Sequence, residues 1–423
     1  MYFLALFFWT AYSLLFFYLL ADSFRKARFA SFIFSFFNIY FLSIRPIFIF
    51  IGLDVPIPSY QFKYDFWQDM VYANLIVFAW AAMSVFVYKY FSVNSDNLKY
   101  NFDIVSIRIL SSVSIIFTLV GALITLNFIV RFGGISEFVF QVKINKSFAG
   151  LYVLREINVW ALLLSGYFFL YTKTLGRNKL NTLSLFLIVT NCLTIFAWGN
   201  RTIIGFFIFM MAVIYYRKLA TLNVRKFVVF ALCMLVLANG LRLIREDFRS
   251  EAVGHDVSSL QTMSAVTAMS LSMHFSQYDG LLLATRDAGK VFKYRDGEDF
   301  INSLTAWVPR FLWPNKPTTF NVGLWFRQIY EPSVSNGWPI TSIGDWYVNG
   351  GLLLVFFGCA LSISLLSAID RFSNQGLFSD YLILVFTTFV VGQGISTGSI
   401  QKTVLTFAPF LFLILLSKIR FRV

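Results

Sequence analysis

Long runs of apolar residues fill most of this 423-residue chain and constrain its fold more than any other feature. A helix needs about 20 apolar residues to cross a bilayer. Only 13% of the residues are charged, whereas soluble domains carry about a quarter. We therefore predict an all-α polytopic membrane protein with about eleven transmembrane helices. The predicted spans are residues 2–20, 30–52, 70–91, 104–129, 151–172, 181–198, 202–216, 227–243, 347–369, 379–399 and 403–417.

The basic residues predict the orientation of the chain. There are 35 Lys and Arg against 21 Asp and Glu, a net charge of +14. Such a balance is also seen in nucleic-acid-binding proteins, but here most basic residues lie in short loops beside apolar spans, which marks the cytoplasmic side. The N-terminus is then expected outside and the C-terminus inside. The loop residues include Arg25, Lys26, Arg28, Lys173, Arg177, Lys179, Arg217, Lys218, Arg225, Lys226, Arg371 and Lys418.

One long polar segment interrupts the spans and is expected to form a large outer loop with short helices. Five of the nine prolines lie between 309 and 339, and five of the ten tryptophans between 307 and 346. Proline fixes the backbone path, and tryptophan favours the boundary between lipid and water. The segment therefore predicts an aromatic-lined platform at the membrane surface. The predicted domains are helices 1–8 in residues 1–243, the loop in 244–346 and helices 9–11 in 347–423.

Arginines near the outer surface are candidates for binding an anion. Arg242, Arg245 and Arg249 are spaced by three and four residues, so they share one helix face. Guanidinium forks suit a diphosphate, and the structural alternative is a solvated helix end paired with acidic neighbours. Arg201 in a tight turn, and Arg310 with Lys316 in the proline segment, are further candidates; their alternative is contact with lipid headgroups.

Arg45 lies in the outer third of the second predicted span. A cation at that depth requires a partner or a water-filled cavity. The sequence leaves open whether Arg45 serves function or structure.

Four residues are the candidates for taking a proton from a hydroxyl group: Asp345, His274, Glu246 and Asp247. Asp345 could equally cap a helix, and a lone histidine is often structural. With two histidines and three cysteines that each sit in an apolar run, no metal site and no cofactor are expected. The acidic run at 296–299 is expected to be a solvated turn.

The chain resembles the Wzy-type polymerases of O-antigen and capsular polysaccharide, which join oligosaccharide repeat units. The resemblance is carried by the Pro-Arg-x-x-Trp-Pro-x-Lys-Pro segment at 309–317, the Gly-Asp-x-Tyr-x-Asn-Gly-Gly run at 344–351, Arg201 in its turn and the arginines at the exit of the eighth span. Many helices with one large outer loop late in the chain also agree with it. These motifs cover about fifty residues, whereas the hydropathy pattern covers the whole chain.

The resemblance implies a glycosyltransferase of the integral-membrane GT-C type in the bacterial inner membrane, with its active site facing the periplasm. Its donor and acceptor would be undecaprenyl-diphosphate-linked oligosaccharides, with no nucleotide sugar and no metal. A chain-length regulator protein is a partner that the resemblance implies. The arginines would hold the leaving diphosphate. Four tryptophans would line the sugar path: Trp307, Trp313, Trp325 and Trp338.

The sequence leaves three alternatives open. An O-antigen ligase shares the architecture and the donor but transfers the chain to lipid A–core. A transporter or flippase would place ionisable residues near the bilayer midplane and often shows repeated halves, whereas the charges of this chain crowd one outer loop. A non-catalytic assembly scaffold is the third.

Overall fold

The computed structural model describes ten stretches of the chain, which contain helices and no β-strand. The described residues form two compact units. Unit 1 takes its residues from 1–100, 264–374 and 386–407, and unit 2 from 101–263, 375–385 and 408–423. The described stretches are residues 1–52, 66–92, 107–143, 152–218, 277–298, 300, 313, 322–332, 337–373 and 376–392.

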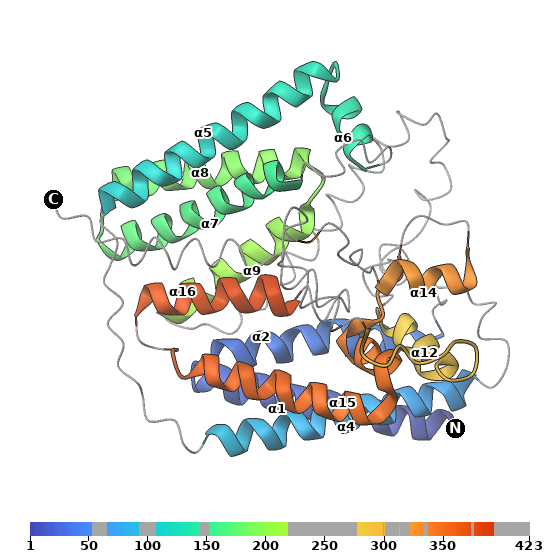
Figure 1. The fold of residues 1–423 in the computed structure, drawn as a ribbon. Helices are drawn as coiled ribbons and strands as arrows, with labels where there is room; N and C mark the ends of the chain where they lie inside the picture. Colours follow the sequence, from blue (N-terminus) through green and yellow to red (C-terminus); the bar gives the residue numbers. More distant parts are fainter. Residues whose placement is uncertain are drawn as a thin grey trace. The chain divides into compact units, whose positions relative to one another are not determined.

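Unit 1 is built on four long helical segments that pack side by side (Figure 1). Helix α1 (Tyr2–Arg25) contacts α4 (Phe66–Ser92) and α2 (Phe29–Asn38), and α15 (Thr341–Asp370) lies against α4 and α2. Helix α2 continues through a short π-helical segment, η1 (Ile39–Ser43), into α3 (Ile44–Phe50). A second π-helical segment, η3 (Thr387–Val391), packs on α2.

Proline explains why the second helical segment changes its winding. Pro46 has no N–H, so the carbonyl of Leu42 loses its helical donor. The hydroxyl of Tyr12 in α1 donates to that carbonyl at 2.8 Å, and the Trp9 indole donates to the Ser43 carbonyl at 2.9 Å. The freed backbone groups are thus satisfied by a neighbouring helix, as a membrane interior requires.

Helix α15 is broken in its first third by two glycines. Gly351 has φ +63°, a conformation that glycine adopts without steric cost. The carbonyl of Val348, just before the break, accepts a hydrogen bond of 3.0 Å from the backbone N–H of Arg295. The Gly-Asp-x-Tyr-x-Asn-Gly-Gly run therefore forms a short helical segment that ends where the longer one begins.

Two short helices of the segment 244–346 belong to unit 1. Helix α12 (Gln277–Asp287) packs on α15 and α4 and is buried along almost its whole length. Helix α14 (Val322–Tyr330) joins α12 and the start of α15 in one apolar cluster. Both lie at the end of unit 1 where the N-terminus is found (Figure 1).

Unit 2 contains a bundle of α5 (Ile107–Arg131), α7 (Tyr152–Thr174) and α8 (Asn178–Ala197). Polar side chains join these helices: the Asn191 amide donates to Thr118 at 2.9 Å and to Ser165 at 3.2 Å. Such hydrogen bonds and small residues are how helices associate in lipid, where the hydrophobic effect is absent. Three more helices complete the described part of the unit: α6 (Ile135–Lys143), α9 (Arg201–Lys218) and α16 (Leu377–Phe386).

The structure confirms a polytopic, all-helical membrane protein in outline. Six described helical segments are long and apolar enough to cross a membrane: α1, α2 through α3, α4, α5, α8 and α15. They coincide with predicted spans one, two, three, four, six and nine. The seventh and tenth correspond to shorter apolar helices at 202–217 and 377–389, and the fifth to α7. The eighth and eleventh lie outside the described residues, so the count of eleven and the GT-C fold stay predictions.

The predicted tight turn between spans six and seven is confirmed. Helix α8 ends at Ala197, Gly199 has φ +67°, and α9 begins at Arg201. The described part of the acidic run, residues 296–298, begins with the expected turn, in which Asp296 is exposed at φ +50° and Gly297 has φ +81°. Asp299 lies outside the described residues.

Candidate functional site

Ionised and hydroxyl-bearing side chains gather where α3, the start of α4, α12, α14 and the first segment of α15 meet. Two apolar clusters hold these elements together, one around Tyr278 and Leu282 and the other around Phe326 and Trp338. We call this region the polar end of unit 1. It contains three of the predicted site residues whose contacts the structure describes: Asp345, Trp325 and Trp338.

The deepest feature of the polar end is an ion pair between α3 and α12. The Nε of Arg45 lies 3.1 Å from Oδ2 and 3.3 Å from Oδ1 of Asp279, and both side chains are fully buried. Burial raises the pKa of Asp279 to about 6, and the Arg45 guanidinium opposes that rise. Arg45, a cation in the second predicted span, is expected to require a partner. That partner is the carboxylate of Asp279, 234 residues further along the chain.

A second contact fixes the same end of α12 to the long helices. The hydroxyl of Tyr278 donates to Oδ1 of Asn74 in α4 at 2.6 Å, and the Asn74 amide donates to the carbonyl of Ala5 in α1 at 2.9 Å. Burial raises the pKa of Tyr278, so its hydroxyl keeps the proton that it donates. Helix α12 is thereby held by α3, α4 and α1 together.

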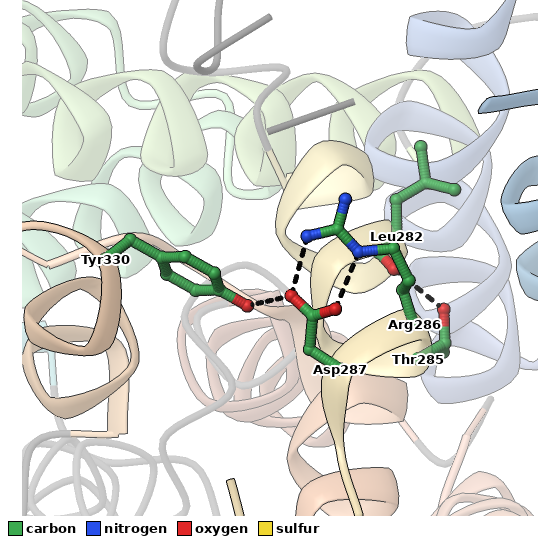
Figure 2. A network of polar contacts seen from close by, with 5 residues as sticks. All are labelled: Leu282, Thr285, Arg286, Asp287 and Tyr330. Carbon is green, nitrogen blue, oxygen red and sulfur yellow. Dashed lines mark hydrogen bonds and ion pairs between the residues drawn. The ribbon is translucent and has the colours of Figure 1, made fainter. Parts of the chain in front are cut away.

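The other end of α12 carries the network shown in Figure 2. The Arg286 guanidinium donates to both carboxylate oxygens of Asp287, at 2.6 and 2.7 Å, and the Tyr330 hydroxyl of α14 donates to Oδ2 at 2.5 Å. Hydrogen bonding to Asp287 raises the pKa of Arg286. Burial, followed by the bond to Asp287, raises the pKa of Tyr330. The carboxylate thus anchors α14 and orients a guanidinium group.

Asp345 lies in the first segment of α15 and is 3% exposed. The Asn349 amide donates to its Oδ1 at 3.2 Å and to its backbone carbonyl at 2.9 Å. The alternative role as a helix cap does not apply, because α15 begins at Thr341, whose hydroxyl accepts a bond from the Gly344 N–H at 3.2 Å. A buried carboxylate one turn before a helix break is a suitable position for a proton acceptor, and that role stays a prediction.

The three described tryptophans of the predicted sugar path differ in their surroundings. Trp313 is 41% exposed. Trp325 is half-buried, with the guanidinium carbon of Arg295 4.8 Å from its ring centre. Trp338 is 2% exposed, and Arg327 lies 5.2 Å from its ring centre. Trp338 therefore packs in the core, so a direct sugar contact is better suited to Trp313 and Trp325.

Of the remaining predicted site residues, Arg201 is the one that falls within the described stretches. Arg201 is the first residue of α9 and belongs to unit 2. The others lie outside the described residues, and their roles stay predictions: Arg242, Arg245, Glu246, Asp247, Arg249, His274, Trp307, Arg310 and Lys316.

Sequence reasoning missed Asp279, Arg286, Asp287 and Tyr330, which form the main polar contacts of this region. One signal was available. The segment Gln277–Asp287 has a run of three leucines between acidic residues, which indicates a short buried helix whose carboxylates need cationic partners. The sequence spacing did not indicate which residues would pair with these carboxylates.

The polar end combines oriented guanidinium groups, buried carboxylates and tyrosine hydroxyls beside apolar helices. Such groups can bind a polar or anionic headgroup while its lipid chain stays in the membrane. Within the described stretches, no three His, Cys, Asp or Glu side chains are grouped as metal ligands would be. Comparison of the chain with protein-family models, curated proteins and solved structures found no match.

Proposed function

We propose that this protein is an integral-membrane glycosyltransferase that polymerises undecaprenyl-diphosphate-linked oligosaccharide repeat units into a surface polysaccharide. It would work in the bacterial inner membrane, with its site on the periplasmic side. The observation that supports this best is the polar end of unit 1, where ion pairs, a buried carboxylate and tryptophans meet at one end of membrane-length helices. A lipid-linked saccharide needs such a site, because its headgroup is polar and its tail is not.

The proposed reaction transfers the growing chain from its lipid diphosphate to the next lipid-linked repeat. The acceptor hydroxyl oxygen bonds to the anomeric carbon, and the bond from that carbon to the diphosphate oxygen breaks, leaving its electron pair on the diphosphate. The hydroxyl proton passes to a carboxylate or imidazole, for which Asp345, Glu246, Asp247 and His274 are the candidates. The arginines would stabilise the charge that develops on the leaving diphosphate.

Gel analysis of the surface polysaccharide of a deletion strain tests this proposal. We expect a single-repeat band in the deletion strain and a ladder when the wild-type chain is restored. The Arg242→Ala chain should fail to restore the ladder. Lys26→Ala is the matched control, because it removes a cation that pairs with Asp22 on a helix surface away from the polar end.

Other outcomes would replace the proposal. Accumulation of lipid-linked polymer in the deletion strain would indicate a ligase. An unchanged ladder would exclude polymerisation and favour a transporter or scaffold. If Arg242, Arg245 and Arg249 can be replaced together without loss, the diphosphate clamp is wrong.

A further inference from the structure

Three tyrosines from three separate elements meet at the polar end of unit 1. Tyr72 comes from α4, Tyr347 from the first segment of α15, and Tyr294 from the chain after α12. The hydroxyls of Tyr72 and Tyr347 are 3.0 Å apart. The ring of Tyr347 meets that of Tyr72 edge-on at 6.4 Å and that of Tyr294 at 6.2 Å.

The cluster has hydrogen-bonding capacity beyond its internal bonds. Each phenol hydroxyl has one donor and can accept as well. Tyr347 is hydrogen-bonded to the hydroxyls of both Tyr72 and Tyr294. These two bonds use two of the three donors, so one hydroxyl hydrogen and several lone pairs of the cluster can still face outward. A saccharide ring carries hydroxyls of the same dual character on a face that is otherwise apolar C–H.

The backbone around the cluster is fixed before any ligand binds. The N–H of Arg295 donates to the Val348 carbonyl at 3.0 Å, which ties the residue after Tyr294 to the residue after Tyr347. Gly351 packs beside Tyr294, since even a Cβ there would lie in ordinary van der Waals contact, 3.6 Å from the Tyr294 hydroxyl. Preorganisation of this kind lowers the entropic cost of binding.

Exposure and charge favour an uncharged ligand. Tyr72 is 38% exposed and Tyr294 36%, whereas Tyr347 is 4% exposed and supports them. The neighbouring cation, Arg295, lies over the Trp325 ring and 3.3 Å from Glu298. The positive charge of Arg295 is therefore already compensated by Glu298 and the Trp325 ring. A site next to a compensated charge suits a neutral sugar better than a phosphate.

We propose that Tyr72, Tyr294 and Tyr347 form a subsite for an uncharged saccharide ring of the substrate. This deepens the proposed function and rests on it for the identity of the sugar. The two exposed rings contact the apolar face of the saccharide, and the hydroxyls bond to its edge. The competing explanation is that these tyrosines only anchor the chain at the membrane interface.

The test compares Tyr→Phe variants, which keep the rings and remove the hydroxyls. The variant Tyr72→Phe with Tyr294→Phe alters two exposed residues, so folding should be preserved. Tyr90→Phe is the matched control, because Tyr90 lies on α4 as well, is 66% exposed and sits near the opposite end of that helix. The full chain in lipid nanodiscs is titrated with the surface polysaccharide of its own bacterium, freed of lipid by mild acid, and separately with inorganic pyrophosphate.

We expect the double variant to bind the saccharide about tenfold more weakly than the wild type, from two lost hydrogen bonds. Tyr90→Phe should bind it as the wild type does, and pyrophosphate binding should be the same in all three. Unchanged saccharide binding in the double variant would overturn the subsite and leave the interfacial role. Equal loss of both probes, or no saccharide binding by the wild type, would overturn it too.

The gel of the deletion strain separates failure of the subsite from failure of the proposed function. Weakened saccharide binding together with an unchanged ladder would support the subsite and exclude polymerisation. A collapsed ladder with unchanged saccharide binding would support polymerisation and exclude the subsite.

Discussion

At the residue scale, one carboxylate joins the end of α15 to the start of α2. Asp370, the last residue of α15, accepts hydrogen bonds from the N–H of Ala30 at 2.7 Å and from the N–H and hydroxyl of Ser31 at 3.0 and 2.6 Å. These N–H groups belong to the first turn of α2, where a helix has no internal acceptors for them. A residue 340 positions away therefore caps α2.

Replacing that carboxylate should destabilise the protein. Asp370→Asn turns one acceptor into a donor, so a buried N–H of α2 loses its partner, at a cost of about 1–3 kcal/mol. Thermal unfolding of the purified chain in detergent measures this. Asp22→Asn, which weakens a partly exposed pair with Lys26, should cost about 0.5 kcal/mol or less; an equal loss in both variants would contradict the cap.

The buried ion pair predicts a pH dependence. Burial raises the pKa of Asp279 from 3.8 to about 6, so the folded chain holds this proton more tightly than the unfolded chain. The resulting stabilisation is complete below pH 3.8 and is lost as the pH rises through about 6. The loss amounts to roughly 2–3 kcal/mol.

Unfolding midpoints between about pH 4 and pH 7 check this sign, with Asp279→Asn as the comparison. The variant should resemble the wild type at about pH 4, where the folded wild type carries a protonated Asp279 that Asn imitates in shape and charge. It should also lack this component of the pH dependence, since Asn does not titrate. Parallel curves for the variant and the wild type would contradict the raised pKa.

At the element scale, α12 depends on a close approach of backbones. A Cβ on Gly280 would overlap the carbonyl oxygen of Pro339, just before α15. Neither group is the end of a flexible side chain, so the clash cannot be relieved by a rotamer change. The hydrogen bond between Trp338 N–H and the Gly323 carbonyl, 2.9 Å, holds the same chain segment against α14.

Gly280→Ala should therefore separate α12 from the start of α15 and destabilise the protein by about 1–3 kcal/mol. Gly205→Ala in α9 is the control, because among the described residues no atom from outside its own helical turn lies within 4 Å of its Cβ position. Alanine there should be neutral or stabilising by up to about 1 kcal/mol. Thermal unfolding in detergent measures the stability of both variants. A Gly280→Ala protein as stable as the wild type would contradict the packing of α12.

At the scale of the whole molecule, the two ends of unit 1 differ in charge. Lys26 and Arg28 lie 5.9 and 5.2 Å from the Tyr88 ring, and Lys89 lies 5.0 Å from that of Tyr18. These groups gather at the end of α4 opposite the polar end. Basic residues beside spans mark the cytoplasmic side, so the polar end should face outward.

Cysteine labelling in intact cells tests this orientation, using a chain whose three native cysteines are replaced by serine. Val291→Cys, at a position 60% exposed near the polar end, should react with a membrane-impermeant maleimide from outside. Lys26→Cys, at a side chain 50% exposed, should react only after the cells are opened. The reverse pattern would invert the topology and move the proposed site to the cytoplasm.

The sequence by itself located the six described helical segments that are long and apolar enough to cross a membrane, because an apolar run of sufficient length needs no partner to predict a span. It also located the turn at Gly199. It did not reveal the break at Gly351 as a structural feature, or the roles of Asp279, Asp287 and Tyr330. Only the tertiary structure decided that Arg45 pairs with Asp279 and that Asp370 caps α2. Partners in these contacts are hundreds of residues apart, and which buried charge meets which is set by helix packing, which local sequence does not encode.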